Sequence, residues 1–343
     1  MHQTLRRRMA MAGLPALLAA PSLLPRPALA QAAVDPAPRP APMPAPTPAP
    51  TPAPTPAPGF YRFRLGGFTV TTVHDGFRDV PLQGFVRNAP LEAVQALLAE
   101  SFLPTEHYRI PFTVTFLDTG RQLVAFDTGN GVTPPGATMG RLPETMRAAG
   151  IDPAKVDLVV HSHFHADHIN GLLNAEGGRA FPNAEVVVPA AEWAWWRDRG
   201  NESRSPEGQR ATFANTARCF APYEGRIRPL AEGAEVIPGL RAVAAPGHTP
   251  GHTAYHVADG AAEMIFVADT TNRPELFARR PDFHAVFDFD ADLAEATRRC
   301  LFDRIAADRI RITGYHFPFP ANGYLAREGA GYRFVPADWS SAL

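Results

Sequence analysis

Short apolar runs and helical patterns alternate along the chain from about residue 59 to its end. Residues 68–73 carry β-branched side chains at alternate positions, which predicts a strand. Leu91, Val94, Leu98 and Phe102 recur at helical spacing, which predicts a helix over 90–102. Further helices are predicted over 139–149 and 291–307, and further strands over 112–117, 122–126, 157–160, 186–188, 240–244, 253–257, 264–267, 311–314 and 332–335. This mixture predicts sheets covered by helices, an α/β layered domain.

The first thirty residues carry the pattern of an export signal. Arg6–Arg8 precede an Ala/Leu-rich apolar stretch, and Ala28–Ala30 supply the small residues of a signal-peptidase site. The paired arginines favour the twin-arginine route, with an ordinary secretory signal as the alternative. Pro15 and Pro21 interrupt the apolar run, which argues against a helix that spans a membrane. We therefore expect residues 1–30 to be a signal peptide and the protein to be exported to the periplasm, without stable membrane insertion.

Residues 31–58 form an Ala/Pro-rich segment. Every even position from 36 to 58 is proline, so 12 residues of this stretch lack a backbone hydrogen-bond donor. Such a segment cannot form a helix or a sheet and is typical of a semi-rigid polyproline spacer. We expect a linker between the signal peptide and one folded domain over 59–343.

Composition narrows the function classes. The formal charge of the whole chain is −1, and removing residues 1–30 leaves 29 basic against 34 acidic residues, a charge of −5. This balance disfavours a protein that binds nucleic acid through basic surfaces. Two cysteines, Cys219 and Cys300, are too few for a disulfide scaffold or a cysteine-based zinc cluster.

The strongest chemical signal is His161-Ser-His-Phe-His-Ala-Asp-His168, which follows the predicted strand over 157–160. Imidazole and carboxylate groups are the usual ligands of a metal such as zinc. His163 and His165 lie two residues apart in an extended segment, so their side chains can point the same way. Asp167 and His168 follow where the chain turns and can face a second ion. The alternative is a group of surface histidines, or a core histidine with neighbours. His161, at the strand end, is expected to be structural or to support the ligands.

Three later segments present the same ligand types. His248 and His252 lie in the turn Pro246-Gly-His-Thr-Pro-Gly-His-Thr253, Asp269 follows the strand over 264–267, and His316 follows the strand over 311–314. Each segment alone is weak evidence, because a histidine or aspartate at a strand end is often merely solvated. All four segments in this order are specific for a metal site.

These segments resemble the metallo-β-lactamase fold superfamily, over about residues 59–343. The tail from Pro274 to Tyr332, with the stretches 60–68 and 139–142, resembles more narrowly the methyl parathion hydrolase-like branch. The resemblance implies an αββα four-layer sandwich with a binuclear metal site at one edge of its two sheets, and thus a hydrolase domain over 59–343.

The resemblance also assigns seven side chains to two divalent ions, expected to be Zn²⁺: His163, His165 and His248 to one, Asp167, His168 and His316 to the other, and Asp269 as the bridge. Asp167 and Asp269 would also serve the reaction. His252 is expected to support the ligands or to pack beside them. Asp127 matches a position that forms hydrogen bonds near the site, with an ordinary turn aspartate before Gly129 as its alternative.

The implied chemistry is hydrolysis by a hydroxide that bridges the two ions, because metal binding lowers the pKa of water to near neutrality. Lactones and carboxylic esters are expected ahead of phosphotriesters of the methyl parathion type. The commonest true β-lactamases have cysteine where this chain has Asp269, which disfavours that activity. A hydrolytic enzyme with a small-molecule substrate is favoured over the alternative of a different class, an exported metal-binding module without catalysis.

Neutral, apolar substrates suit an aromatic pocket. Trp193, Trp195 and Trp196 lie in one helical-looking segment. Helical geometry places Trp195 about 200° around the axis from Trp193, so the three rings cannot all face one core. Core packing of two of them is one alternative, and a role in substrate binding or in a homodimer contact for at least one is the other.

Overall fold

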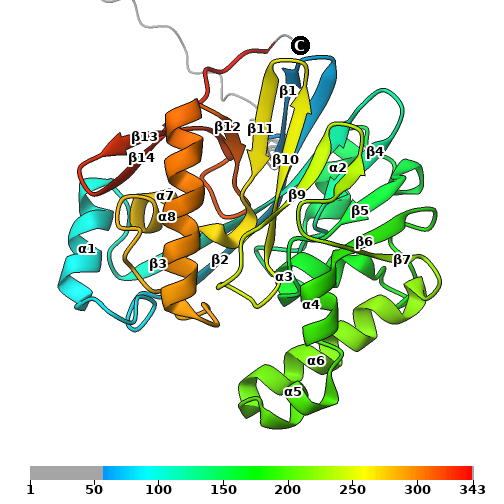
Figure 1. The fold of residues 1–343 in the computed structure, drawn as a ribbon, viewed down its shortest axis with the longest axis horizontal. Helices are drawn as coiled ribbons and strands as arrows, with labels where there is room; N and C mark the ends of the chain where they lie inside the picture. Colours follow the sequence, from blue (N-terminus) through cyan, green and yellow to red (C-terminus); the bar gives the residue numbers. More distant parts are fainter. Residues whose placement is uncertain (1–56, 342–343) are drawn as a thin grey trace, which may run out of the picture. The chain divides into compact units, whose positions relative to one another are not determined.

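The computed structural model describes residues 57–341. The predicted signal peptide, and the predicted linker up to residue 56, lie outside the described residues. Within the described range the chain forms two seven-stranded sheets with helices on their outer faces (Figure 1). The expected layered α/β class with two sheets is confirmed.

The first sheet follows the order of the chain. Neighbouring strands are antiparallel from β1 to β4 and parallel from β4 to β7. Its strands are β1 (Phe60–Leu65), β2 (Phe68–Pro81), β3 (His107–Asp118), β4 (Leu123–Phe126), β5 (Leu158–Val160), β6 (Glu185–Pro189) and β7 (Ile227–Leu230). All three residues of β5 are buried, as expected for a parallel strand that is covered on both faces.

The second sheet is antiparallel except for the pair β11 and β12. Its strands are β8 (Glu235–Ile237), β9 (Leu240–Ala244), β10 (Thr253–Asp259), β11 (Ala262–Phe266), β12 (Arg311–Thr313), β13 (Asn322–Glu328) and β14 (Gly331–Pro336). A parallel pair needs a long crossover connection, and here that crossover carries two helices over residues 274–308.

The helices fill the outer layers. α2 packs against β2, α4 against β6 and β7, and α8 against β13. The helices are α1 (Leu91–Glu100), α2 (Leu142–Ala148), α3 (Ala166–Ile169), α4 (Ala190–Trp195), α5 (Arg199–Arg204), α6 (Glu207–Phe220), α7 (Pro274–Phe277) and α8 (Ala291–Asp308). Short 3₁₀ turns cover Pro153–Lys155, Asn170–Leu172, Ala221–Tyr223 and Ala268–Thr270. None of the helices within residues 57–341 has both the length and the apolar character to cross a bilayer.

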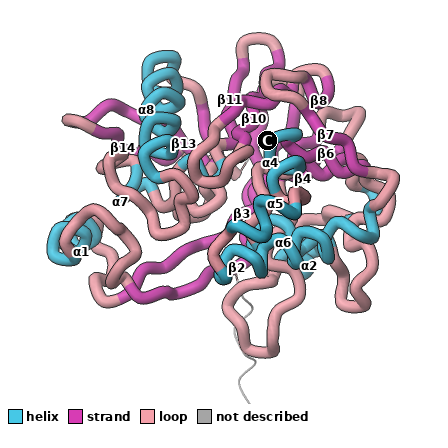
Figure 2. The backbone as a smooth tube through the Cα atoms, turned by 60° about the horizontal axis from the view of Figure 1, so that its bottom comes forward, coloured by secondary structure: helices cyan, strands magenta, loops and turns pink. Residues whose placement is uncertain are grey.

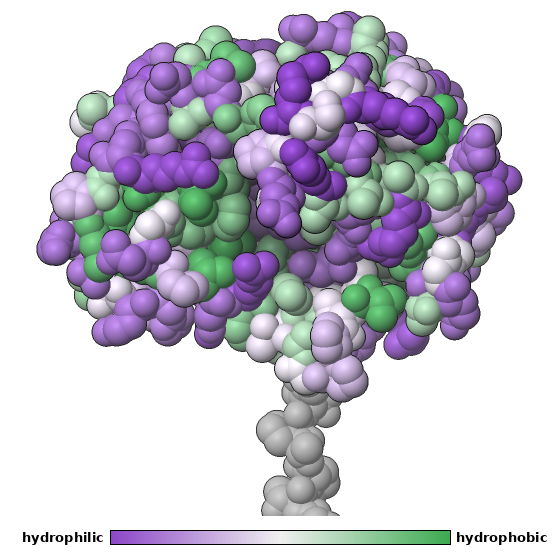
Figure 3. Space-filling view, turned by 90° about the horizontal axis from the view of Figure 1, so that it is seen from below, coloured by the Kyte–Doolittle hydropathy of each residue, from purple (hydrophilic) through white to green (hydrophobic). Residues whose placement is uncertain are grey.

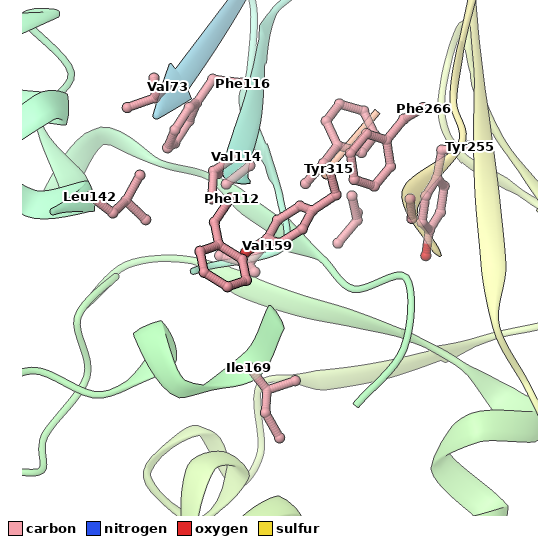
Figure 4. Packing of buried hydrophobic residues seen from close by; sticks show 14 of the residues in the cluster. Val73, Phe112, Val114, Phe116, Leu142, Val159, Ile169, Tyr255, Phe266 and Tyr315 are labelled. Carbon is pink, nitrogen blue, oxygen red and sulfur yellow. The ribbon is translucent and has the colours of Figure 1, made fainter. Parts of the chain in front are cut away.

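Aromatic rings join the inner faces of the two sheets. The ring of Phe126 on β4 lies 5.1 Å from that of Phe266 on β11 and 5.8 Å from that of Tyr255 on β10, centroid to centroid. All three side chains are fully buried, and Figure 4 shows Phe266 and Tyr255 in this packing. Strands of both sheets end near these three rings. The packing of the rings therefore fixes the points at which the loops after those strands begin.

Strand β2 differs most from the prediction. The predicted strand over 68–73 continues to Pro81, and its register with β3 shifts between His74 and Gly76. Gly76 has a φ of +112°, and a Cβ there would lie 2.1 Å from the Thr138 carbonyl oxygen, so this bulge requires glycine. Beyond the bulge, β2 and β3 extend as a two-stranded ribbon toward α1 (Figure 2).

The predicted helix over 139–149 begins later, at Leu142. Gly140 has a φ of +79°, which lies outside the helical range. The helix can therefore begin only after Gly140. Among the described residues the two cysteines are free, Cys219 buried and Cys300 exposed. No disulfide therefore contributes to the stability of this part of the chain.

We predict that Phe266→Ala lowers the free energy of unfolding by about 3–5 kcal/mol, because it leaves a cavity between the two sheets. Urea denaturation followed by circular dichroism measures this change. Phe102→Ala is the control: Phe102 is 97% exposed, so its loss changes stability by about 0.5 kcal/mol or less. Equal effects of the two substitutions would contradict the assigned core.

Candidate metal centre

The candidate centre is built where β5, β9, β11 and β12 end. The chain leaves β5 at Val160 and passes directly through the segment 161–168. The His161 N–H donates to the Val187 carbonyl oxygen at 2.9 Å, and the Ser162 carbonyl oxygen accepts from the Thr253 N–H at 3.0 Å. The histidine segment is thus tied by its backbone to both sheets.

The first donor set consists of His163, His165 and His248. The Nδ1 atom of His165 lies 3.0 Å from Nε2 of His163 and 3.0 Å from Nε2 of His248. His163 and His248 are buried and His165 is half-buried. Three imidazole nitrogens thus converge, and their lone pairs have few other partners. They form a ligand set suited to one divalent ion.

The second donor set consists of Asp167, His168 and His316. Oδ2 of Asp167 lies 3.6 Å from Nε2 of His168 and 3.6 Å from Nε2 of His316. The histidines are buried, whereas the Asp167 side chain is 26% exposed. This mixed imidazole and carboxylate set can hold a second divalent ion.

Asp269 lies between the two sets. Its Oδ2 atom is 3.3 Å from Nε2 of His248 and 3.0 Å from Nε2 of His316, and its Oδ1 atom is 3.3 Å from Nε2 of His168. Oδ1 of Asp269 and Nε2 of His168 are buried without a hydrogen-bond partner. Buried polar atoms rarely stay unpaired in proteins, so the donor chemistry of the cluster fits bound metal ions.

The ring nitrogens that face away from the cluster are also held. Nδ1 of His168 lies 2.8 Å from Oδ2 of Asp127, and Nδ1 of His316 lies 2.9 Å from the Pro111 carbonyl oxygen. Asp127 in turn accepts hydrogen bonds from the Ser162 backbone N–H and hydroxyl at 2.8 and 2.7 Å. Such contacts fix the orientation of an imidazole and leave Nε2 free to bind a metal.

His252 lies within the cluster but both of its nitrogens are engaged. Nδ1 donates to the Ala245 carbonyl oxygen at 3.0 Å, which leaves Nε2 to accept from the Asp269 backbone N–H at 3.0 Å. His252 therefore positions Asp269. His161, also fully buried, lies 3.4 Å from Oδ1 of Asp127 and packs edge-on against Phe164 and Phe220.

Sequence reasoning missed two carboxylates of the centre. Oδ1 of Asp288 lies 3.0 Å from Nδ1 of His248. Glu192 is fully buried on α4 and accepts from the Phe164 N–H at 3.1 Å, the Thr249 hydroxyl at 2.9 Å and the Gly251 N–H at 2.8 Å. A carboxylate within the apolar face of a helix is the sequence signal that marks Glu192, whereas Asp288 lies in an irregular segment with no such pattern.

Burial sets the charge state of two rings in the first donor set. It lowers the pKa of His163 and of His165 well below the ordinary value for histidine. Both rings are therefore neutral at pH 7, the form that binds a metal. Burial acts to raise the pKa of Asp269, but His316 and His168 outweigh it and hold this pKa well below its ordinary value. The acid between the two sets is thus an anion.

The three tryptophans occupy different places. Trp196 is buried and its indole N–H donates to Glu192 at 2.6 Å. Trp193 and Trp196 line a cavity of about 580 Å³ whose walls contain none of the metal-ligand candidates. The ring of Trp195 instead lies 5.3 Å from that of Phe289, whose backbone N–H donates to the His248 carbonyl oxygen at 3.1 Å. Trp195 thus reaches the backbone of His248 through Phe289, whereas Trp196 reaches the histidine segments through Glu192.

Comparison with known proteins agrees with this fold. The family model of the metallo-beta-lactamase superfamily matches residues 112–308, and the chain belongs to this superfamily. It is a metal-dependent hydrolase, as expected. The matched range spans the histidine segment, the turn with His248, and Asp269, and ends before His316.

Two solved structures and one curated protein are similar to this chain. An N-acyl homoserine lactonase from Bacillus sp is 23% identical over 210 residues, 56% of this chain and 75% of that protein. AidC, a dizinc quorum-quenching lactonase in complex with its product, has a TM-score of 0.77 and 22% identity over 82% of this chain and 99% of its own. The hydrolase AbOPH of the beta-lactamase superfamily has a TM-score of 0.78 and 24% identity over 84% of this chain and 100% of its own. At these identities the structures show a shared fold.

We predict that Glu192→Ala lowers the free energy of unfolding by about 3 kcal/mol or more, because it leaves four buried donors without an acceptor, one of them Trp196 and the others in the two histidine segments. The same change loosens the two histidine segments and so weakens metal binding. Urea denaturation of the metal-free protein and a competition titration with a coloured chelator measure the two effects. The exposed Glu176, replaced by alanine, is the control; if Glu192→Ala matched it in both measurements, Glu192 would not join these segments.

Proposed function

We propose that this protein is an exported binuclear hydrolase of neutral, apolar lactones or carboxylic esters. The observation that carries the proposal is Asp269, whose two oxygens face histidines of both donor sets. His163, His165 and His248 would hold one ion, Asp167, His168 and His316 the other, and Asp269 both. A set of five imidazole nitrogens and two carboxylates suits Zn²⁺. The signal-like residues 1–30 support export to the periplasm.

Two such ions, when bound, supply positive charge that lowers the pKa of water and polarises the carbonyl group of a substrate. The residues of the chain hold that charge in place. The neutral rings of His163 and His165 and the Asp269 anion would face the bound ions. Asp127, His252 and Asp288 fix the orientation of His168, Asp269 and His248.

The partly exposed members of the cluster mark the side from which a substrate arrives. His165 and Asp167 are the ligand candidates that are not fully covered. Asp167 is therefore the carboxylate that we assign to proton exchange with water or with the leaving alcohol, at Oδ1, since Oδ2 faces His168 and His316. This carboxylate can reach solvent, whereas Asp269 is 6% exposed.

An apolar wall beside the centre suits a neutral substrate. Phe287 and Phe289 flank Asp288 and are 43% and 36% exposed. Phe287 packs edge-on against Phe85 at 5.6 Å, and Phe289 packs against Trp195. Figure 3, which views the molecule from below the view of Figure 1, shows hydrophobic residues among hydrophilic ones on that face. We infer that these rings contact the acyl or alkyl part of the substrate.

The relatives support lactones as the first class to test, because the proteins named above as lactonases share the fold. The second candidate is a phosphotriester, which the C-terminal resemblance to the methyl parathion hydrolase-like branch supports. Both substrate classes are neutral, so the same apolar wall fits either of them.

We predict that Asp269→Asn reduces hydrolysis of the favoured substrate at least about 100-fold, since losing even an outer partner of a metal ligand costs about 10–100-fold. The assay uses an N-acyl homoserine lactone, a p-nitrophenyl ester and a phosphotriester, with metal content measured on the same samples. The control is Asp292→Asn, because the Asp292 side chain is 96% exposed. Full activity of Asp269→Asn with both ions bound would overturn the proposal.

We also predict that Phe289→Ala raises KM for a decanoyl lactone about 10-fold and changes KM for a butanoyl lactone little. Loss of about 1.4 kcal/mol of apolar contact with the longer chain gives this factor. Steady-state kinetics over a series of chain lengths measures it. Tyr324 on β13 is 38% exposed, and Tyr324→Ala serves as the matched control. A KM that rises equally for short and long chains would contradict the assigned wall.

A further inference from the structure

Arg298 is a charged residue on the buried face of α8. The other buried residues of that helix are Ala294, Leu301, Phe302 and Ile305. Arg298 is 2% exposed, and arginine is almost never fully buried unless its charge is paired. An apolar residue would continue the face of the helix at this position, so the guanidinium group needs a specific explanation.

The guanidinium group contacts two segments that lead into the candidate metal centre. Nε donates to the Thr270 carbonyl oxygen at 2.8 Å, next in sequence to Asp269. Nη1 donates to the Pro281 and Phe283 carbonyl oxygens at 2.8 and 3.1 Å. Nη2 lies 3.5 Å from Oδ2 of Asp288. One side chain thus joins α8, the segment after β11 and the segment that carries Asp288.

Asp288 connects this contact to a metal-ligand candidate. Its Oδ2 atom also accepts from the Ala285 N–H at 3.1 Å, and its Oδ1 atom faces Nδ1 of His248 at 3.0 Å. The Asp288 and Arg298 side chains are both 2% exposed, so water does not screen their attraction. The guanidinium holds Asp288, and Asp288 sets the tautomer of His248 that leaves Nε2 free.

We propose that Arg298 is a positioning residue of the metal centre, which fixes the Asp288–His248 pair of the first donor set and the backbone beside Asp269. The proposal rests on the proposed function, because it assumes that His248 and Asp269 bind metal. Arginine suits the role because its planar fork donates in several fixed directions at once, which a lysine ammonium on a flexible stem does not reproduce.

A purely structural role for Arg298 would predict a different outcome. Contacts with Pro281 and Phe283 alone would stabilise the loop without any effect on metal affinity at a given temperature. A positioning role predicts weaker binding of one ion, the one held by His163, His165 and His248, while the second ion is retained. Metal affinity therefore separates the two roles, and activity is not needed as a readout.

The test compares four variants of the full-length protein with the wild type. Arg298→Met removes the charge at similar volume, Arg298→Lys keeps the charge, and Asp288→Asn keeps the shape of the partner. Arg273→Met is the matched control: Arg273 is also buried and paired, with Glu275, and contacts neither a ligand candidate nor Asp288. Chelator competition with Zn²⁺ and the visible absorption spectrum of the Co²⁺-substituted protein measure each site.

We expect Arg298→Met and Asp288→Asn to weaken metal affinity at one of the two sites about 10–100-fold. Both should also change the Co²⁺ spectrum. The affinity of Arg298→Lys should lie between those of these variants and the wild type. Arg273→Met should bind both ions as wild type does, even if it lowers the unfolding temperature. If Arg298→Met does not fold, Asp288→Asn and Arg298→Lys still decide the question.

The inference fails if the Arg298 and Asp288 variants bind both ions with wild-type affinity, or if Arg273→Met weakens binding equally. A wild-type protein that binds fewer than two ions would instead refute the proposed function, so the two failures are distinguishable.

Discussion

Five imidazole rings and two carboxylates share one largely buried space at the ends of the two sheets. Burial disfavours the charged form of each group, and neighbouring histidines would repel one another if they were protonated. The protein meets this constraint with neutral rings at His163 and His165 and with an anionic Asp269 between the sets. As a result, nitrogen lone pairs and carboxylate oxygens point toward one another. Bound metal ions would stabilise this geometry.

The surrounding contacts follow from the need to hold these groups still. Asp127 holds His168, Asp288 holds His248, and the backbone of Pro111 holds His316. Two buried charged side chains then fix the segments themselves: Glu192 joins the two histidine-bearing segments, and Arg298 joins the segments of Asp269 and Asp288. Burying these charges is costly unless they are fully hydrogen-bonded, and both have three or more partners.

Local patterns in the sequence predicted the centre better than the contacts that support it. The four ligand-type residues from His163 to His168 lie within six positions, and the apolar run of β5 places them at a sheet edge. The histidine segments that Glu192 and Asp288 contact lie 28–59 and 40 positions away from them, so no local pattern could pair them. The length of β2 was underestimated for a related reason, since its outer half pairs with β3 as a ribbon and carries polar residues on exposed positions.

Asp269 holds the central position in the proposed centre, because it would join two metal ions. Electron paramagnetic resonance of the protein loaded with Mn²⁺ tests this claim directly, because two ions that share a bridging ligand couple magnetically. We predict that the signal of isolated Mn²⁺ is lost as the second equivalent binds, and that a coupled spectrum replaces it. A spectrum of isolated ions at full loading, or binding that stops at one ion per chain, would contradict the account.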